Sequence, residues 1–142
     1  MDTTSPPDIR AFLDRYAAAL VGGDLPGIAG CYALPALVVG DSNTVPVAEA
    51  GQIEAAFAGA ADGYRAQGLV GARPELRAVD SVTAALTLVD VRWAYLDADG
   101  RERQHSEYRY LLRRTGSGEL AIQVVIDTTA APAQPEARPA TS

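Results

Sequence analysis

Apolar residues in the first half of the chain recur at the three- and four-residue spacing of amphipathic helices. The first predicted helix begins at Pro7, since proline is tolerated in the first turn, and stops at Gly22. Asp24 is a suitable N-cap for a second, shorter helix that runs to about Cys31. A third helix is predicted over residues 50–67. The apolar faces of the first and third helices comprise Ile9, Phe12, Leu13, Tyr16, Ala17 and Leu20, and Ile53, Ala56, Phe57, Ala60 and Tyr64.

Beyond Gly68, and in a short stretch before the third helix, the pattern changes to β-branched and aromatic residues bounded by turn signals. Residues 97–100 and 116–118 predict two hairpin turns, because their Asp and Gly residues tolerate positive φ. Residues 80–81 predict a further turn or bulge, and Pro35 predicts a break in the chain. Strands are predicted over residues 37–39, 45–47, 77–79, 82–96, 102–115 and 120–128.

A length of 142 residues fits one domain, predicted over residues 7–128 between a flexible lead-in, 1–6, and a disordered tail, 129–142. The net charge of −6 argues against a nucleic-acid partner, whose phosphates require a basic face. No apolar run reaches the ~18 residues of a membrane span, and the N-terminus lacks the pattern of a secretory signal. With Cys31 as its one cysteine, the chain is expected in a reducing compartment, the cytoplasm.

The residue inventory excludes several kinds of catalysis. All 12 basic residues are arginine, so Schiff-base chemistry and a P-loop lysine are impossible. One histidine and one cysteine cannot build a three-histidine or four-cysteine zinc site, and we predict neither a metal nor a cofactor. His105 has two interpretations, a general base near neutrality or an exposed histidine beside a hairpin. Cys31 has the character of a small buried hydrophobe.

Three helices, a short hairpin and a long antiparallel meander follow one another over residues 9–127. Local motifs accompany this order: Tyr16-Ala-Ala-Ala-Leu20, Gly23-Asp24-Leu25, Gly27-Ile28, Tyr32, Asp99-Gly100 and residues 108–114 before a glycine turn. Together they resemble the NTF2-like superfamily, including SnoaL-like and ketosteroid-isomerase-like proteins. The resemblance implies an α+β cone, in which three N-terminal helices pack on a curved mixed or antiparallel sheet around a cavity. It also implies a homodimer formed through the outer face of the sheet.

Among the enzymes of this superfamily, the first helix resembles that of ketosteroid isomerase. The resemblance implies that Tyr16 stands at the position of an oxyanion-donating tyrosine, and that Tyr110 stands where the family has a second oxyanion acid. The general base of that family falls on Gly40, with Asp41 one residue away. Because a one-residue slip turns a strand side chain to the other face, Asp41 is no direct substitute. We therefore do not predict steroid isomerisation.

An aromatic wall is predicted on the inner face of the sheet. If Tyr110 faces inward, strand alternation brings Tyr108 inward as well. Trp93 and Tyr95 share one face of their strand, either towards the cavity or, alternatively, in a dimer interface. The candidate ligand-binding residues are Tyr32, Phe57, Tyr64, Trp93, Tyr95 and Tyr108. The alternative is that the aromatic side chains fill the core, with their hydroxyls satisfied locally.

Asp127 ends the last predicted strand and has two interpretations. It is a surface carboxylate if the aliphatic face of that strand, which carries Ile122 and Ile126, is the buried one. It is the best carboxylate for acid–base work if the curved sheet turns it into the cavity mouth. Tyr16, Tyr110 and Asp127 are therefore the candidate catalytic residues.

Two functions are consistent with these residues. The first is a pocket protein that binds a small apolar or polyketide-like molecule, with cofactor-free isomerisation, dehydration or hydrolysis as its chemistry. The second is a non-catalytic dimeric domain. Its outer sheet face, which carries Arg109, Leu111 and Arg113, contacts a second copy or another protein.

Overall fold

The computed structural model describes residues 4–129, and the predicted tail from residue 130 onward lies outside the described residues. Within the predicted lead-in, Thr4 is buried, and its Oγ1 accepts a hydrogen bond from Nη2 of Arg114 at 3.0 Å. Part of the segment that was expected to be flexible therefore packs against the domain.

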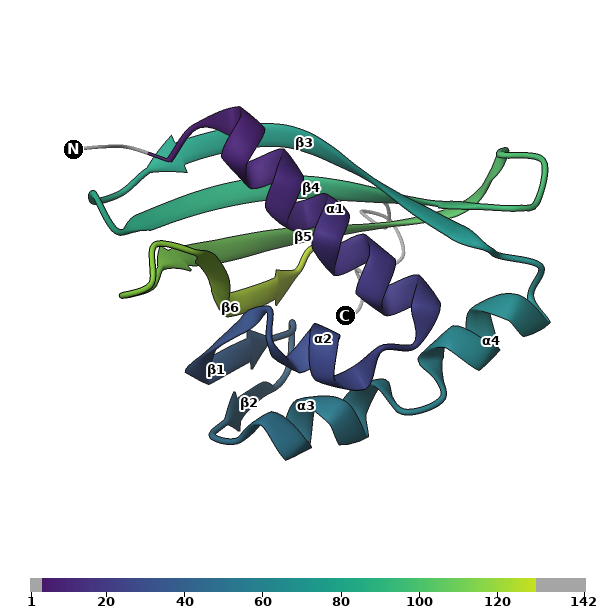
Figure 1. Ribbon diagram of the computed structural model, residues 1–142, viewed down its shortest axis with the longest axis horizontal. Coiled ribbons are helices and arrows are strands. Elements are labelled where there is room, and N and C mark those ends of the chain that lie inside the picture. The colour runs from purple at the N-terminus through teal and green to yellow at the C-terminus, as the bar shows by residue number, and fades with distance from the viewer. Residues whose placement is uncertain (1–3, 130–142) are drawn as a thin grey trace.

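The long N-terminal helix α1 (Pro6–Gly22) begins one residue earlier than predicted. Ser5 is its N-cap and accepts a hydrogen bond from the backbone N–H of Asp8 at 3.3 Å, and Gly23 ends it in a left-handed conformation with φ 69°. Figure 1 shows α1 lying across strands of the sheet. The predicted apolar face is the buried one: Ile9, Phe12, Leu13, Tyr16, Ala17 and Leu20. This face forms the centre of the core between helix and sheet.

The remaining helices are shorter than predicted. The second, α2 (Leu25–Ala29), begins at the Asp24 N-cap as expected but ends before Cys31. The predicted third helix is two helices, α3 (Ala50–Phe57) and α4 (Ala60–Ala66). Gly59 separates them, because its left-handed backbone (φ 83°) cannot continue a right-handed helix. This break changes the chain direction between Phe57 and Tyr64.

Six strands form one mixed sheet, and in Figure 1 α1 passes in front of β3, β4 and β5. They are β1 (Tyr32–Val39), β2 (Thr44–Val47), β3 (Gly71–Ser81), β4 (Leu86–Leu96), β5 (Glu102–Arg114) and β6 (Leu120–Asp127). Their order across the sheet is β2-β1-β6-β5-β4-β3, with β1 and β6 parallel and the other pairs antiparallel. The predicted α+β architecture is confirmed.

Three predicted strands have the wrong bounds, and the first of them is β3, which covers Gly71–Ser81 rather than residues 77–79. The chain does not break at Pro35: β1 starts at Tyr32 and continues through that proline, although its pairing with β6 is irregular there. The turn predicted at residues 80–81 lies at 82–85 instead, so β4 begins at Leu86. There the Oγ1 of Thr83 accepts hydrogen bonds from the backbone N–H groups of Ala85 and Leu86, at 3.2 and 3.0 Å, which holds the turn.

A β-bulge in β6 controls which side chains face inward at the end of the chain. Leu112 pairs with Ile122, whereas Tyr110 pairs with Val125, so Gln123 is an extra residue in β6. Because cross-strand partners share a face, Ile122 and Val125 are both buried although three positions separate them. Beyond the bulge, Val125 and the following alternate residues face inward.

Candidate functional site

A cavity of about 260 Å³ lies between the inner face of the sheet and helices α1, α3 and α4. Its wall is formed by Tyr16, Leu20, Tyr32, Val38, Ala56, Phe57, Tyr64, Trp93, Tyr95, Tyr108, Tyr110, Val125 and Asp127. All the predicted catalytic and ligand-binding residues are in this wall. The wall contains all six tyrosines and the one tryptophan of the chain.

The deep end of the cavity is built from buried tyrosines held by hydrogen bonds. The hydroxyls of Tyr16, on α1, and Tyr32, at the start of β1, lie 2.6 Å apart. The Nε1–H of Trp93 donates to the hydroxyl oxygen of Tyr110 at 2.9 Å. The ring of Tyr16 makes edge contacts with Tyr32, Trp93 and Tyr110 at centroid distances of 6.0–6.5 Å. Phe12 stacks behind it. These contacts fix the hydroxyl positions.

The other end of the cavity is more exposed and carries the only charged side chain of the wall, Asp127. Tyr108 is the cross-strand partner of Asp127 and stacks on Tyr110 at 5.7 Å. Tyr64 from α4 stacks on Tyr95 from β4 at 5.6 Å. One oxygen of Asp127, Oδ1, accepts a hydrogen bond from the backbone N–H of Thr129 at 2.9 Å.

The bulge in β6 determines the face of the sheet on which Asp127 lies. Without it, Asp127 would lie on the face opposite Ile122, because five positions separate the two residues. With Gln123 inserted, Asp127 follows Val125 on the inner face and lies in the cavity wall. Asp127 therefore lines the cavity and is also exposed, so it is a surface carboxylate at the cavity mouth.

The tyrosine hydroxyls of the cavity are neutral hydrogen-bond donors at physiological pH. Burial raises the pKa of Tyr16 and of Tyr110 well above the usual value, and raises the pKa of Tyr32 to about 12. For Tyr108, burial and then the nearby Asp127 carboxylate raise the pKa. The cavity therefore offers protonated donors at its deep end and a carboxylate acceptor at its mouth. This pairing suits a ligand with an apolar body and few polar groups.

Other sequence candidates lie elsewhere. Asp41 is exposed between β1 and β2 and is absent from the cavity wall. His105 is exposed on β5, which supports its interpretation as a surface histidine. Cys31 is buried, as expected, and burial raises the pKa of its thiol. Within residues 4–129, no three His, Cys, Asp or Glu side chains gather as a metal site requires.

Four wall residues were not singled out as site residues from the sequence. They are Leu20, Val38, Ala56 and Val125. Leu20 follows Tyr16 by one helical turn, and Ala56 shares the predicted apolar face of its helix, so helical spacing contains a signal for both. The position of Val125 depends on the bulge and has no such signal. The close approach of the Tyr16 and Tyr32 hydroxyls is likewise visible only in the fold.

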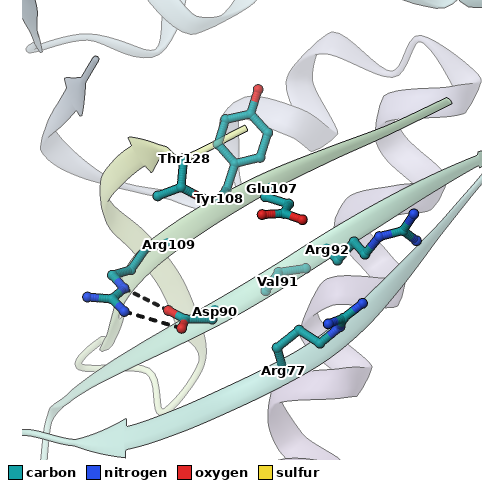
Figure 2. A pocket seen from close by; sticks show the side chains of 8 residues that line it. All are labelled: Arg77, Asp90, Val91, Arg92, Glu107, Tyr108, Arg109 and Thr128. Carbon is teal, nitrogen blue, oxygen red and sulfur yellow. Dashed lines mark hydrogen bonds and ion pairs between the residues drawn. The ribbon is translucent and has the colours of Figure 1, made fainter. Parts of the chain in front are cut away.

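The outer face of the sheet carries a second hollow, of about 320 Å³, drawn in Figure 2. Several charged side chains of this face pair with one another. Arg109 binds Asp90 through two hydrogen bonds, Nε–Oδ1 at 2.7 Å and Nη2–Oδ2 at 3.2 Å. Arg92 lies between Glu102 and Glu75, and its hydrogen bonds lower the pKa of Glu102. Figure 2 shows the ring of Tyr108 turned away from these charged side chains.

Helices that cover one face of a mixed sheet, with an aromatic cavity between the two layers, define a class of small α+β pocket proteins. A family model described as an NTF2-like protein (DUF6841) matches residues 7–129. The chain belongs to this NTF2-like family, which confirms the resemblance to NTF2-like proteins that the sequence indicated.

Solved structures with the same fold share little sequence with this chain. An NTF-2 like protein of unknown function from Shewanella oneidensis has a TM-score of 0.65 at 13% identity, over 84% of this chain and 95% of that one. A ketosteroid isomerase-like protein from Erwinia carotovora has a TM-score of 0.60 at 15% identity, over 89% and 96%. Aln2 from a Streptomyces species has a TM-score of 0.63 at 19% identity, over 88% and 92%. At these identities the likeness shows the fold alone.

No curated protein sequence matches the chain. Among the described residues, no helix is both long enough and apolar enough to cross a membrane.

Proposed function

We propose that this protein binds a small, largely apolar molecule in the tyrosine-lined cavity. The observation that carries the proposal is the convergence of all six tyrosines, from α1, α4 and three strands, on one hollow. Core packing alone seldom leaves such a space, since protein interiors are close-packed. A cavity of about 260 Å³ exceeds the ~150 Å³ hollow that accepts benzene and falls below the ~300 Å³ of drug-sized pockets. The ligand is therefore about the size of one or two rings.

Binding is tested by titration with phenol, indole and naphthalene, followed by calorimetry. The fluorescence of Trp93 supplies a second signal for phenol and naphthalene, because this sole tryptophan is in the cavity wall. We expect saturable binding at one site for at least one of these compounds. Ala56→Phe is the blocking control. Ala56 lies in the cavity wall, so a larger side chain there takes up space in the cavity, and its exposure means that the core is not disturbed. Absence of saturable binding in the unmodified protein would overturn the proposal.

The cavity also suits cofactor-free acid–base chemistry, such as isomerisation, dehydration or hydrolysis of the bound molecule. In this reaction Asp127 accepts a proton at the mouth, and the hydroxyls of Tyr16 or Tyr110 donate hydrogen bonds to an oxygen that gains negative charge. The support is the combination of a carboxylate and neutral donors in one wall. The ketosteroid isomerase-like protein from Erwinia carotovora shares the fold, which is compatible with such chemistry without identifying the substrate.

The Kemp elimination of 5-nitrobenzisoxazole measures the basicity of Asp127 without knowledge of the natural substrate. A base removes the ring C–H proton, the N–O bond breaks, and the oxygen leaves as a phenolate. We expect catalysis above the buffer rate that is lost in Asp127→Asn and retained in Asp41→Asn, which removes an exposed carboxylate outside the cavity. Equal rates in both variants would exclude Asp127 as the base.

A second candidate function, which does not exclude the first, is a homodimeric interaction domain. The outer sheet face carries both signs of charge, with Arg109 paired to Asp90 and Arg92 paired to Glu102, so the face can complement a second copy of itself. Light scattering tests this at micromolar concentration, where we expect a dimer that Arg109→Glu weakens. A strict monomer would contradict it. The cytoplasm remains our proposed compartment, in which the buried thiol of Cys31 stays reduced.

A further inference from the structure

The cavity wall has an unbalanced composition, in which aromatic side chains and one acidic group occur without a basic one. Eight of its side chains are aromatic: the six tyrosines, Trp93 and Phe57. One side chain, Asp127, has a carboxylate, and none of the wall residues is basic. Two arginines on the outer face of the same strands, Arg92 and Arg109, do not compensate for this, because they are engaged with Glu102 and Asp90. Apart from four aliphatic side chains, the wall therefore consists of aromatic rings and one carboxylate.

The tyrosine hydroxyls do not supply a counter-charge. Burial favours their neutral form, as shown by the raised pKa of Tyr16, Tyr32 and Tyr110. An anionic ligand would meet the Asp127 carboxylate with no cation to offset it. A neutral ligand would gain only apolar contact and hydrogen bonds from this wall. A cationic ligand would make the same contacts and would also be attracted electrostatically by the negative faces of the aromatic rings and by the carboxylate.

The carboxylate is available for such a cation. Oδ1 of Asp127 accepts only the backbone N–H of Thr129, and Asp127 has no ion-pair partner among residues 4–129. Three partly buried tyrosines, Tyr64, Tyr95 and Tyr108, belong to the same end of the cavity. Aromatic rings are the groups that proteins use to hold quaternary and protonated ammonium groups, and a neighbouring carboxylate adds an opposite charge.

We propose that the ligand of this cavity is a monocationic organic amine, with a ring-sized apolar body towards Tyr16 and Tyr110 and its ammonium group near Asp127. The inference rests on the cavity being the binding site proposed above, and it narrows the ligand class from apolar molecules in general to apolar ammonium compounds. The volume of about 260 Å³ accommodates a single ring with a trimethylammonium group.

The test compares two probes of the same shape, phenyltrimethylammonium and its neutral carbon isostere tert-butylbenzene. Binding of both to the full-length protein is followed by Trp93 fluorescence and by calorimetry. We expect the cation to bind about tenfold more tightly, a difference of the size that cation–π attraction in a partly desolvated site produces. Asp127→Asn is expected to weaken the cation about threefold, as removal of an exposed charge partner does, and to leave tert-butylbenzene unchanged. Asp41→Asn, with the same change in net charge, should alter neither.

The possible outcomes distinguish the claim that the cavity binds ligands from the claim that its ligand is an ammonium compound. Equal or tighter binding of tert-butylbenzene would overturn the ammonium assignment and leave the cavity as a site for neutral apolar ligands. Equal weakening of the cation by Asp41→Asn and Asp127→Asn would reduce the effect to overall charge, and would also overturn it. If neither probe binds, and phenol, indole and naphthalene do not bind either, the proposed pocket function fails together with the inference.

Discussion

The hydrogen bond between Trp93 and Tyr110 gives the sharpest prediction of stability. Trp93 is 1% exposed, and its Nε1–H donates to the Tyr110 hydroxyl at 2.9 Å. Tyr110→Phe removes the acceptor and leaves a buried N–H without a partner, which costs about 1–3 kcal/mol of unfolding free energy. Tyr108→Phe is the matched control, because Tyr108 stacks on Tyr110 from the same strand and no described residue hydrogen-bonds its hydroxyl. We expect a change of about 0.5 kcal/mol or less in that control.

The measurement is urea unfolding followed by circular dichroism, with the m-value checked for constancy between variants. A double-mutant cycle with Trp93→Phe should give a coupling energy of about 1 kcal/mol between the two side chains. If Tyr110→Phe costs no more than Tyr108→Phe, water in the cavity replaces the lost acceptor. The claim that this bond fixes the deep wall would then be wrong.

Three further predictions concern the cavity as a whole. Tyr16→Phe should lower the affinity for phenol about threefold to tenfold in calorimetry and leave that for naphthalene unchanged, because only phenol uses a hydroxyl partner. Ala56→Phe should abolish binding of naphthalene while the melting temperature stays within a few degrees, since Ala56 is exposed. Burial raises the pKa of Tyr32 and Tyr64 to about 12, so the unfolded chain loses these protons first, near pH 10. The unfolding free energy should therefore be unaffected by these groups below pH 10 and fall between pH 10 and 12, and a rise over that interval would contradict the assignment.

Sequence reasoning reached the features that depend on local pattern. The face of α1 with Phe12 and Tyr16 follows from helical spacing, and it is the buried face. Alternation along β4 favoured an inward Trp93, because an aromatic pair is cheaper to bury than the charged pair that alternates with it, although a dimer interface stayed open as the alternative; the structure places Trp93 in the cavity wall. The turn at residues 97–100 formed as expected, and Gly100 has positive φ (82°).

What sequence reasoning could not reach depends on irregularities of the backbone. The inward position of Asp127 requires the extra residue Gln123 in β6, and no residue type marks a bulge of this kind. The division of the third helix arises at Gly59, which the helical pattern around it conceals. The passage of β1 through Pro35 opposes the local preference of proline and is held by pairing of β1 with β2 and with the distant strand β6.

The central claim is that an open hollow, rather than a filled core, separates the helices from the tyrosines of the sheet. A crystal of the protein pressurised with xenon tests this directly, since xenon enters apolar cavities and is located by its electron density. We predict a xenon site bounded by Tyr16, Phe57, Trp93 and Val125. Diffraction data with no xenon there, and with the tyrosine side chains packed into that space, would contradict the account.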